Sequence, residues 1–299
     1  MNGKIVTLSA FLIVLVMAIS ACEKNEQTRQ SPVGTVKASP AYIENFGQPP
    51  APDEGSCYAR VGFFPLRDDP EKVRAVPFFL FRHSGQLQQL LERIVGAEMS
   101  LPGDSGLFNP FPEGTSVNVR NLEGDSVKLE VDFADRQGSD PELKAAAAAL
   151  TETAVQYEGI ERVIVLFDGA LPPGAPSGGY RHDPARTAPV EAPVLFMIAA
   201  SWKKGEAHPE EIAANFDRPV DIQSFHLEDA EGREILGDYF QSVFDMSVII
   251  HPENPAAIRE GMIMRAEWEV TDKLGRRGLG SGEFQLERYD HPPAGPALQ

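Results

Sequence analysis

Two short serine motifs contain residue types that could support nucleophilic catalysis. Gly103-Asp104-Ser105-Gly106 has the composition of a serine nucleophile loop, but Leu107-Phe108 follow it and no matching histidine motif precedes it. Gly124-Asp125-Ser126-Val127 lies between two alternating segments, where Gly-Asp is favourable turn chemistry. The chain has no Gly-x-Ser-x-Gly elbow and no His-Glu-x-x-His pair. We therefore predict no catalytic residues and no enzymatic activity.

Cys57 is a further candidate nucleophile, because its side chain is a thiol. It would need a histidine nearby to be activated, and its neighbour Tyr58 begins a predicted strand. We expect a half-buried or free thiol, with oxidative dimerisation through Cys57 as the alternative.

Metal binding has equally weak candidates. Asp68-Asp69 and the pair Asp229 and Glu231 could hold calcium, but they lack the Asp-x-Asp-x-Asp-Gly spacing of a dedicated loop. We interpret them as solvated acidic turns. Met262 and Met264 share the apolar face of a predicted strand, so core packing explains them better than copper binding. The sequence predicts no metal and no cofactor.

Composition excludes several classes of protein. The chain has 299 residues, of which 42% are hydrophobic and 24% charged, as in globular proteins. Its formal net charge of −17 repels phosphate backbones, so nucleic acid is not an expected partner.

The first 22 residues have the features of an export signal. One positive charge in Met1 to Lys4 precedes an apolar run from Ile5 to Ile19, which is shorter than a bilayer-spanning helix. Ile19-Ser20-Ala21-Cys22 resembles the lipobox of bacterial lipoproteins. That resemblance implies cleavage before Cys22, lipidation of its thiol, and a lipid-anchored protein on the extracytoplasmic face of a bacterial membrane. Glu23 leaves both the inner and the outer membrane open.

The remaining chain is expected to fold as two domains behind a tether. Residues 23–55 are polar and proline-rich, which predicts a flexible tether. Residues 56–171 mix periods of two and 3.6, which indicates a small α/β domain with a mixed sheet. Residues 172–192 are rich in proline and glycine and predict a linker that permits relative motion. Residues 193–290 read as all-β, and residues 291–299 form a tail.

Two helices are predicted in the α/β domain. Gly85–Glu98 places its leucines and isoleucine on one face, with Ser84 as N-cap. The second helix starts at Ser139-Asp140-Pro141-Glu142, a capping box, and closes at Gly159. The strands are predicted at 58–64, 76–81, 117–119, 127–133 and 162–167, with 117–133 forming a hairpin.

Residues 57–171 resemble the GerMN domain, named from a spore-germination protein and found in extracytoplasmic lipoproteins. The resemblance is carried by Phe111-Pro112-Glu113-Gly114-Thr115, by the segment from Leu150-Thr151-Glu152-Thr153 through Gly159-Ile160-Glu161-Arg162-Val163, and by Asp168-Gly169. It implies two helices packed on a small mixed sheet, acting as a binding or assembly module without enzymatic activity.

About seven strands are predicted over 193–290, a number typical of an immunoglobulin-like sandwich. The most regular strand has Met264, Ala266 and Trp268 on its apolar face. Phe216-Asp217-Arg218-Pro219-Val220-Asp221 and Val270-Thr271-Asp272-Lys273-Leu274-Gly275 resemble immunoglobulin-like modules of bacterial envelope proteins. The predicted fold class is thus α+β, a GerMN domain followed by a β-sandwich.

We expect a membrane-anchored, non-catalytic module for a cell-envelope partner. The partner is either a protein complex, such as a sporulation or germination complex, or peptidoglycan. The alternative is a small-solute or metal-binding lipoprotein that uses a cleft between the domains, and an envelope hydrolase is the least favoured hypothesis.

Overall fold

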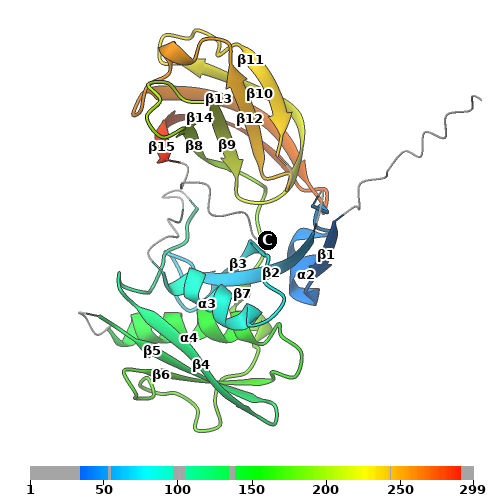
Figure 1. Ribbon diagram of the computed structural model, residues 1–299. Helices are drawn as coiled ribbons and strands as arrows, with labels where there is room; N and C mark the ends of the chain where they lie inside the picture. The colour runs from blue at the N-terminus through cyan, green and yellow to red at the C-terminus, as the bar shows by residue number, and fades with distance from the viewer. Residues whose placement is uncertain are drawn as a thin grey trace, which may run out of the picture. The chain divides into compact units, whose positions relative to one another are not determined.

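The computed structural model describes residues 34–52, 55–96, 101, 105–134, 139–242 and 244–290 (Figure 1). The predicted signal peptide, the predicted lipidation site Cys22 and the tail 291–299 lie outside these ranges. Within them, no helix combines the length and the apolar character needed to cross a membrane.

The N-terminal domain contains two separate β-sheets. The first has the strand order β1-β2-β3-β7, in which β1 runs parallel to β2 and β2 runs antiparallel to β3. Its strands are β1 (Thr35–Ala38), β2 (Ser56–Pro65), β3 (Val73–Leu80) and β7 (Thr187–Ala188). The second has the order β4-β5-β6, with β4 (Ser116–Glu123), β5 (Ser126–Asp132) and β6 (Arg162–Phe167).

Two helices, α3 (Gln86–Val95) and α4 (Asp140–Ala154), lie between these sheets (Figure 1). Both helices contact strands of both sheets. One hydrophobic core therefore joins α3 and α4 to β2, β3 and β5, with Phe64, Leu90, Leu129 and Leu150 fully buried in it. The expectation of two helices on one mixed sheet is corrected, because the helices are covered on both sides.

The two helix starts differ in how well the sequence predicted them. Ser139 and Glu142 do form the expected cap, since the Ser139 backbone N–H and hydroxyl both donate to the Glu142 carboxylate. The predicted cap at Ser84 is wrong, because α3 begins after Gly85 in a left-handed conformation and no side chain caps it. The second helix ends at Ala154, so Gly159 lies in the turn beyond it.

The flexible tether predicted for 23–55 is wrong for its second half. Thr35–Ala38 pairs with β2, and Pro40–Phe46 forms α2, whose N-cap Ser39 accepts a hydrogen bond from the Tyr42 N–H. Tyr42 and Phe46 are buried against β2 and β3. Proline occupies the first turn of α2, where it is tolerated, so the proline content of this segment does not prevent a helix.

The linker predicted for 172–192 is also wrong as a separate segment. Tyr180 forms a β-bridge with Val163 of β6, and Thr187–Ala188 pairs with β3 as the edge strand β7. Val190 is buried in the core beneath α2. The segment therefore belongs to the N-terminal domain and crosses from one of its sheets to the other.

Glutamine side chains cover two strand edges in this domain that have no neighbouring strand among the described residues. Gln156, just after α4, accepts from the Val61 N–H at 3.0 Å and donates to the Val61 carbonyl at 2.5 Å. Gln88 of α3 donates to the Val117 carbonyl at 2.8 Å and accepts from the Val119 N–H at 2.7 Å. Each side-chain amide thus replaces the neighbouring strand that these edges lack.

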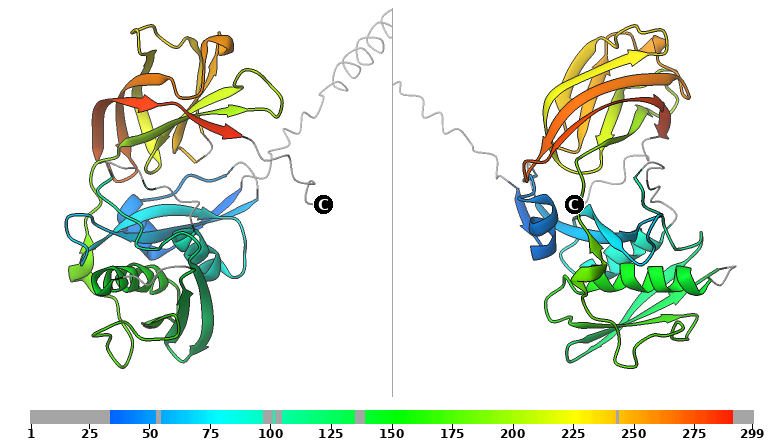
Figure 2. Two further views of the ribbon diagram at one scale, coloured as in Figure 1. Left: turned by 90° about the vertical axis from the view of Figure 1, so that its left-hand side faces the viewer. Right: turned by 180° about the vertical axis from the view of Figure 1, so that it is seen from behind.

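The C-terminal domain, residues 193–290, consists of two β-sheets that face each other (Figure 2). The three-stranded sheet has the order β10-β13-β14 and the five-stranded sheet β11-β12-β9-β8-β15. Their strands are β10 (Val220–Asp229), β13 (Ile263–Asp272), β14 (Arg277–Gln285), β11 (Gly237–Gln241), β12 (Ser247–Pro252), β9 (Glu211–Phe216), β8 (Leu195–Trp202) and β15 (Glu287–Asp290).

The core of this domain follows the predicted alternation. Met264, Ala266, Trp268 and Val270 of β13 face the inner side of the five-stranded sheet. The methionine therefore packs in the core. A two-sheet β domain is confirmed, with eight described strands where about seven were expected.

The glycines of β14 make room for Trp268. A Cβ atom on Gly280 would lie 2.3 Å from the Trp268 ring. We expect Gly280→Ala to lower the free energy of unfolding by about 1–3 kcal/mol because it overpacks this contact. Gly178→Ala is the matched control, since a Cβ there meets no atom within 4 Å among the described residues. Urea denaturation measures the free energy of unfolding of both variants. Equal stability of the two would contradict the conclusion that Gly280 makes room for the Trp268 ring.

Candidate binding site

Two hollows flank α4 in the N-terminal domain. One, of 840 Å³, lies between α2, the end of α4 and residues 181–189. The other, of 620 Å³, lies between the β2–β3 turn, the start of α4 and residues 173–186. The segment from His182 to Arg186 lines both hollows and separates them.

A buried carboxylate holds this dividing segment on α4. Glu152 is only 2% exposed, and its Oε2 lies 2.6 Å from Nδ1 of His182. Its Oε1 accepts a hydrogen bond from the Asp183 N–H at 3.0 Å. Burying a carboxylate is costly unless it is hydrogen-bonded, and both oxygens of Glu152 are satisfied by the segment. The segment between the two hollows is thus fixed to α4, and we call the 840 Å³ hollow with Glu152 and His182 in its wall the groove along α4.

Sequence reasoning missed this pair. Glu152 was noted as part of the GerMN resemblance, and His182 was assigned to a linker. On the helix, Glu152 lies opposite the apolar stripe that the sequence predicts from Leu143 to Tyr157, where an acidic side chain is expected to be solvated. Because α4 is covered on both sides, this face is buried too, and nothing in the sequence identified His182 as the partner of Glu152.

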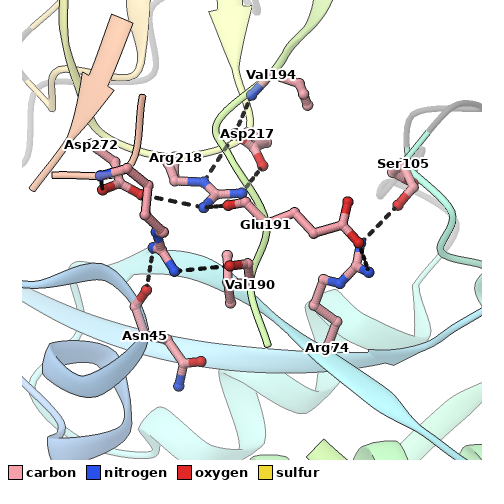
Figure 3. A network of polar contacts seen from close by, with 10 residues as sticks. Asn45, Arg74, Ser105, Val190, Glu191, Val194, Asp217, Arg218 and Asp272 are labelled. Carbon is pink, nitrogen blue, oxygen red and sulfur yellow. Dashed lines mark hydrogen bonds and ion pairs between the residues drawn. The ribbon is translucent and has the colours of Figure 1, made fainter. Parts of the chain in front are cut away.

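The second polar cluster joins the two domains (Figure 3). Arg218 is buried, and its guanidinium makes paired hydrogen bonds to the Asp217 carboxylate. It also donates to the Glu191 carbonyl at 2.6 Å and lies 3.4 Å from the Asp272 carboxylate. Its positive charge is therefore balanced by two carboxylates.

Arg276 continues this cluster into the N-terminal domain. Its Nε donates to Asp272 at 2.6 Å, and its terminal nitrogens donate to the carbonyls of Val190 and Asn45. Asn45 lies in α2, so the C-terminal domain holds the N-terminal segment that the sequence placed in the tether. Relative motion of the domains was expected from the linker, but direct hydrogen bonds from Arg218 and Arg276 join them.

The serine motifs form turns. The Ser105 hydroxyl accepts from the Leu107 N–H, and the Ser105 carbonyl accepts from Arg74. Gly103 and Asp104 lie outside the described residues. Ser126 donates to Asp125 beside the β4–β5 turn, and Asp125 pairs with Arg162, which holds the pKa of Asp125 below its ordinary value.

Cys57 is a buried free thiol in β2. Burial raises its pKa above the ordinary value of 9.0. Because the unfolded thiol loses its proton first as pH rises, the free energy of unfolding falls above pH 9.0. We expect this pH slope to be smaller in Cys57→Ala, measured by urea denaturation between pH 7 and about 10. An identical slope in both proteins would show that Cys57 does not contribute.

The acidic side chains of the predicted turns make hydrogen bonds and ion pairs within their own loops. Asp229 accepts from the N–H groups of Glu231 and Arg233, and its carboxylate pairs with Arg233. Asp69 pairs with Lys72 at 3.6 Å. Among the described residues, no group of three or more histidine, cysteine or acidic side chains is arranged to hold a metal ion.

Comparison with known families assigns the N-terminal domain. Residues 62–171 match the family described as Germane, sporulation and spore germination. The prediction of a GerM-type domain over 57–171 is confirmed for this range. The match covers less than half of the chain and leaves the C-terminal domain unassigned.

Three solved structures are similar to parts of the chain. The tandem GerMN domains of the sporulation protein GerM from Bacillus subtilis share 19% identity over 42% of this chain, with a TM-score of 0.33; the chain spans 44% of that structure. The first GerMN domain of the same protein shares 19% identity over 42% of this chain and 93% of its own, with a TM-score of 0.32. CopC from Methylosinus trichosporium OB3b shares 15% identity over 34% of this chain and 99% of its own, with a TM-score of 0.23.

The Germane assignment of the N-terminal domain rests on the family match over residues 62–171. No curated protein matches the chain.

Proposed function

We propose that this protein is a lipid-anchored, extracytoplasmic binding module that holds a component of the cell envelope without catalysis. The observation that carries the proposal is the Germane domain with the hollow between α2 and α4, joined to a second domain through hydrogen bonds from Arg218 and Arg276 to its backbone carbonyls. Two domains held together in this way present their surfaces in a fixed relation, which suits assembly rather than turnover.

The partner is a protein complex of the envelope, such as a sporulation or germination complex, or peptidoglycan. The mixed charges of the groove, with Glu44 and Glu161 beside Arg181 and His182, suit a partner that carries charges of both signs. The net charge of −17 disfavours nonspecific binding to polyanions, so binding to peptidoglycan would have to be specific.

Anchoring is proposed to use Cys22, which would receive lipid after signal cleavage. The test is fractionation of cells that express Cys22→Ala. We expect this variant to leave the membrane fraction and to lose the mass of the lipid. A variant that still sediments with membranes as a lipidated species would disprove the anchor.

Partner binding is tested by co-sedimentation of the full-length protein with purified peptidoglycan sacculi at two salt concentrations. Peptidoglycan is itself a polyanion, and so acidic a protein should not bind it nonspecifically. Binding that survives high salt therefore supports peptidoglycan as the partner.

A protein partner is tested in cells by placing a photo-crosslinking residue at Arg181, with the same residue at Arg233 of the C-terminal domain as control. Crosslinks from position 181 alone support a protein partner, and failure of both experiments contradicts the proposal.

A small-solute binding protein is the second candidate function. The 840 Å³ hollow beside Glu152 and His182 favours it, because that volume is within the range of small-ligand pockets. The hollow lies within the N-terminal domain, whereas the sequence predicts such a site between the domains. A thermal shift with a solute library, compared between the parent protein and His182→Ala, separates this function from the first.

A further inference from the structure

The outer face of the five-stranded sheet carries an apolar row that crosses four strands. In register, Phe240 of β11 lies opposite Ile249 of β12, which lies opposite Ala213 of β9, which lies opposite Ala199 of β8. The residues next to these in each strand, such as Ile250, Ile212 and Ala200, belong to the core. Because side chains alternate along a strand, the row faces away from the core.

A polar row runs beside it. His251 of β12 lies 3.7 Å from the carboxylate of Glu211 in β9. Glu211 is opposite Ser201 of β8, and Ser201 is opposite Tyr289 of β15. The two rows together form an amphipathic strip across the strands, with an exposed aromatic ring at either end: Phe240, 50% exposed, and Tyr289, 55% exposed.

A hollow of 280 Å³ lies at the Tyr289 end of this strip. Ala199 and Ala213 line it together with Met197, and Tyr289 and Glu211 contribute an aromatic ring and a carboxylate. Ser201 also lines the hollow and is only 5% exposed. Its hydroxyl has no hydrogen-bond partner among the described residues. A buried hydroxyl without a partner costs free energy, so this atom points to a ligand that supplies one.

We propose that this strip binds a neutral glycan built of N-acetylated amino sugars. The apolar C–H faces of sugar rings stack on exposed aromatic rings, which Phe240 and Tyr289 supply. The methyl of an N-acetyl group fits the alanine-lined hollow, its carbonyl accepts from the Ser201 hydroxyl, and its N–H donates to Glu211. The polar row serves the ring hydroxyls.

Charge and length support this occupant. A carboxylate lies in the hollow and the chain carries −17, which disfavours an anionic ligand and a second copy of the chain. Five strands at about 4.8 Å spacing give a strip of about 19 Å, which is long enough for an oligosaccharide of several sugars. The inference rests on the proposed envelope function and identifies the glycan strand of peptidoglycan as the class of partner.

The test is calorimetric titration of the full-length protein in detergent with tetra-N-acetylchitotetraose. We expect saturable binding, and none with cellotetraose, which has the same linkage without N-acetyl groups. Tyr289→Ala and Phe240→Ala should each weaken binding by about tenfold through loss of ring stacking. Ser201→Ala should weaken it about threefold, because only a hydroxyl is lost. Leu279→Ala is the control, since Leu279 is exposed on β14 of the other sheet and should leave binding unchanged.

Binding that is lost in the two aromatic variants and kept in Leu279→Ala supports the proposal. Absence of saturable chitotetraose binding, equal binding of cellotetraose, or equal affinity of all variants overturns it. If sacculi still bind the protein while chitotetraose does not, the glycan site fails and the envelope function stands. If neither binds and no partner crosslinks to the groove, both fail.

Discussion

Arg218→Ala should lower the free energy of unfolding by about 3–5 kcal/mol. Arg218 is the buried cation between Asp217 and Asp272, and it also donates to the Glu191 carbonyl. Its removal leaves the Asp272 carboxylate, whose side chain is 1% exposed, with Arg276 as its remaining ion-pair partner among the described residues. Removing a buried cation that two carboxylates share costs far more than the loss of a surface ion pair.

Urea denaturation followed by tryptophan fluorescence measures this change. Both tryptophans, Trp202 and Trp268, lie in the core of the C-terminal domain, so their fluorescence reports on it directly. Arg233→Ala is the matched control, because Arg233 also pairs with an aspartate, Asp229, but its own side chain is exposed. We expect that control to change stability by at most about 1 kcal/mol. A similar loss in both variants would mean that burial of Arg218 does not matter.

Arg218→Lys separates charge from geometry. Lysine keeps the positive charge but cannot reproduce the paired hydrogen bonds of a guanidinium to Asp217. We expect a stability between those of the parent protein and Arg218→Ala. A lysine variant as stable as the parent would show that charge alone, without the fork geometry, sustains this junction.

Gln156→Leu should lower the free energy of unfolding by about 2–4 kcal/mol. The substitution keeps the side-chain volume similar but removes the amide that bonds both the N–H and the carbonyl of Val61. It also removes the acceptor of the Ser39 hydroxyl. Val61 is fully buried, so its backbone groups cannot easily turn to water and lose their partners outright.

Gln89→Leu is the control for that experiment. Gln89 lies on α3, and its side-chain oxygen is buried without a hydrogen-bond partner among the described residues. Replacing an unpaired polar group by an apolar one of similar size is neutral or stabilising. We therefore expect thermal unfolding to show a lower midpoint for Gln156→Leu and an unchanged or higher one for Gln89→Leu. The reverse order would refute the assignment of Gln156 as the edge cover of β2.

Local pattern allowed the sequence to predict most regular elements. The alternation of Val127, Leu129 and Val131 located β5, and Gly124-Asp125 located the turn before it. Ser139 and Glu142 located the start of α4, because a capping box lies within four consecutive residues. The family resemblance over 57–171 also came from contiguous motifs, and the match over 62–171 confirmed the domain.

The errors occurred where order depends on contacts that are distant in sequence. Residues 35–46 were predicted as tether because the stretch 23–55 around them is polar and contains five prolines. Tyr42 and Phe46, however, gain a buried surface only when β2 and β3 are already beside them. The segment 172–192 looked like a linker for the same reason, and Glu152 of α4 holds it in place.

The sequence by itself thus determined the acidic charge, the GerM-type domain and the strands and helices whose periodicity is complete within one segment. Only the tertiary structure decided the groove along α4, the glutamine-covered edges and the junction in which Arg276 reaches Asn45, 231 residues away. The physical reason is that hydrophobic periodicity and capping act between neighbours in the chain. The free-energy cost of burying a charge or an unpaired strand edge is offset by hydrogen-bonding groups that the fold brings next to it, and these groups can be far away in the sequence.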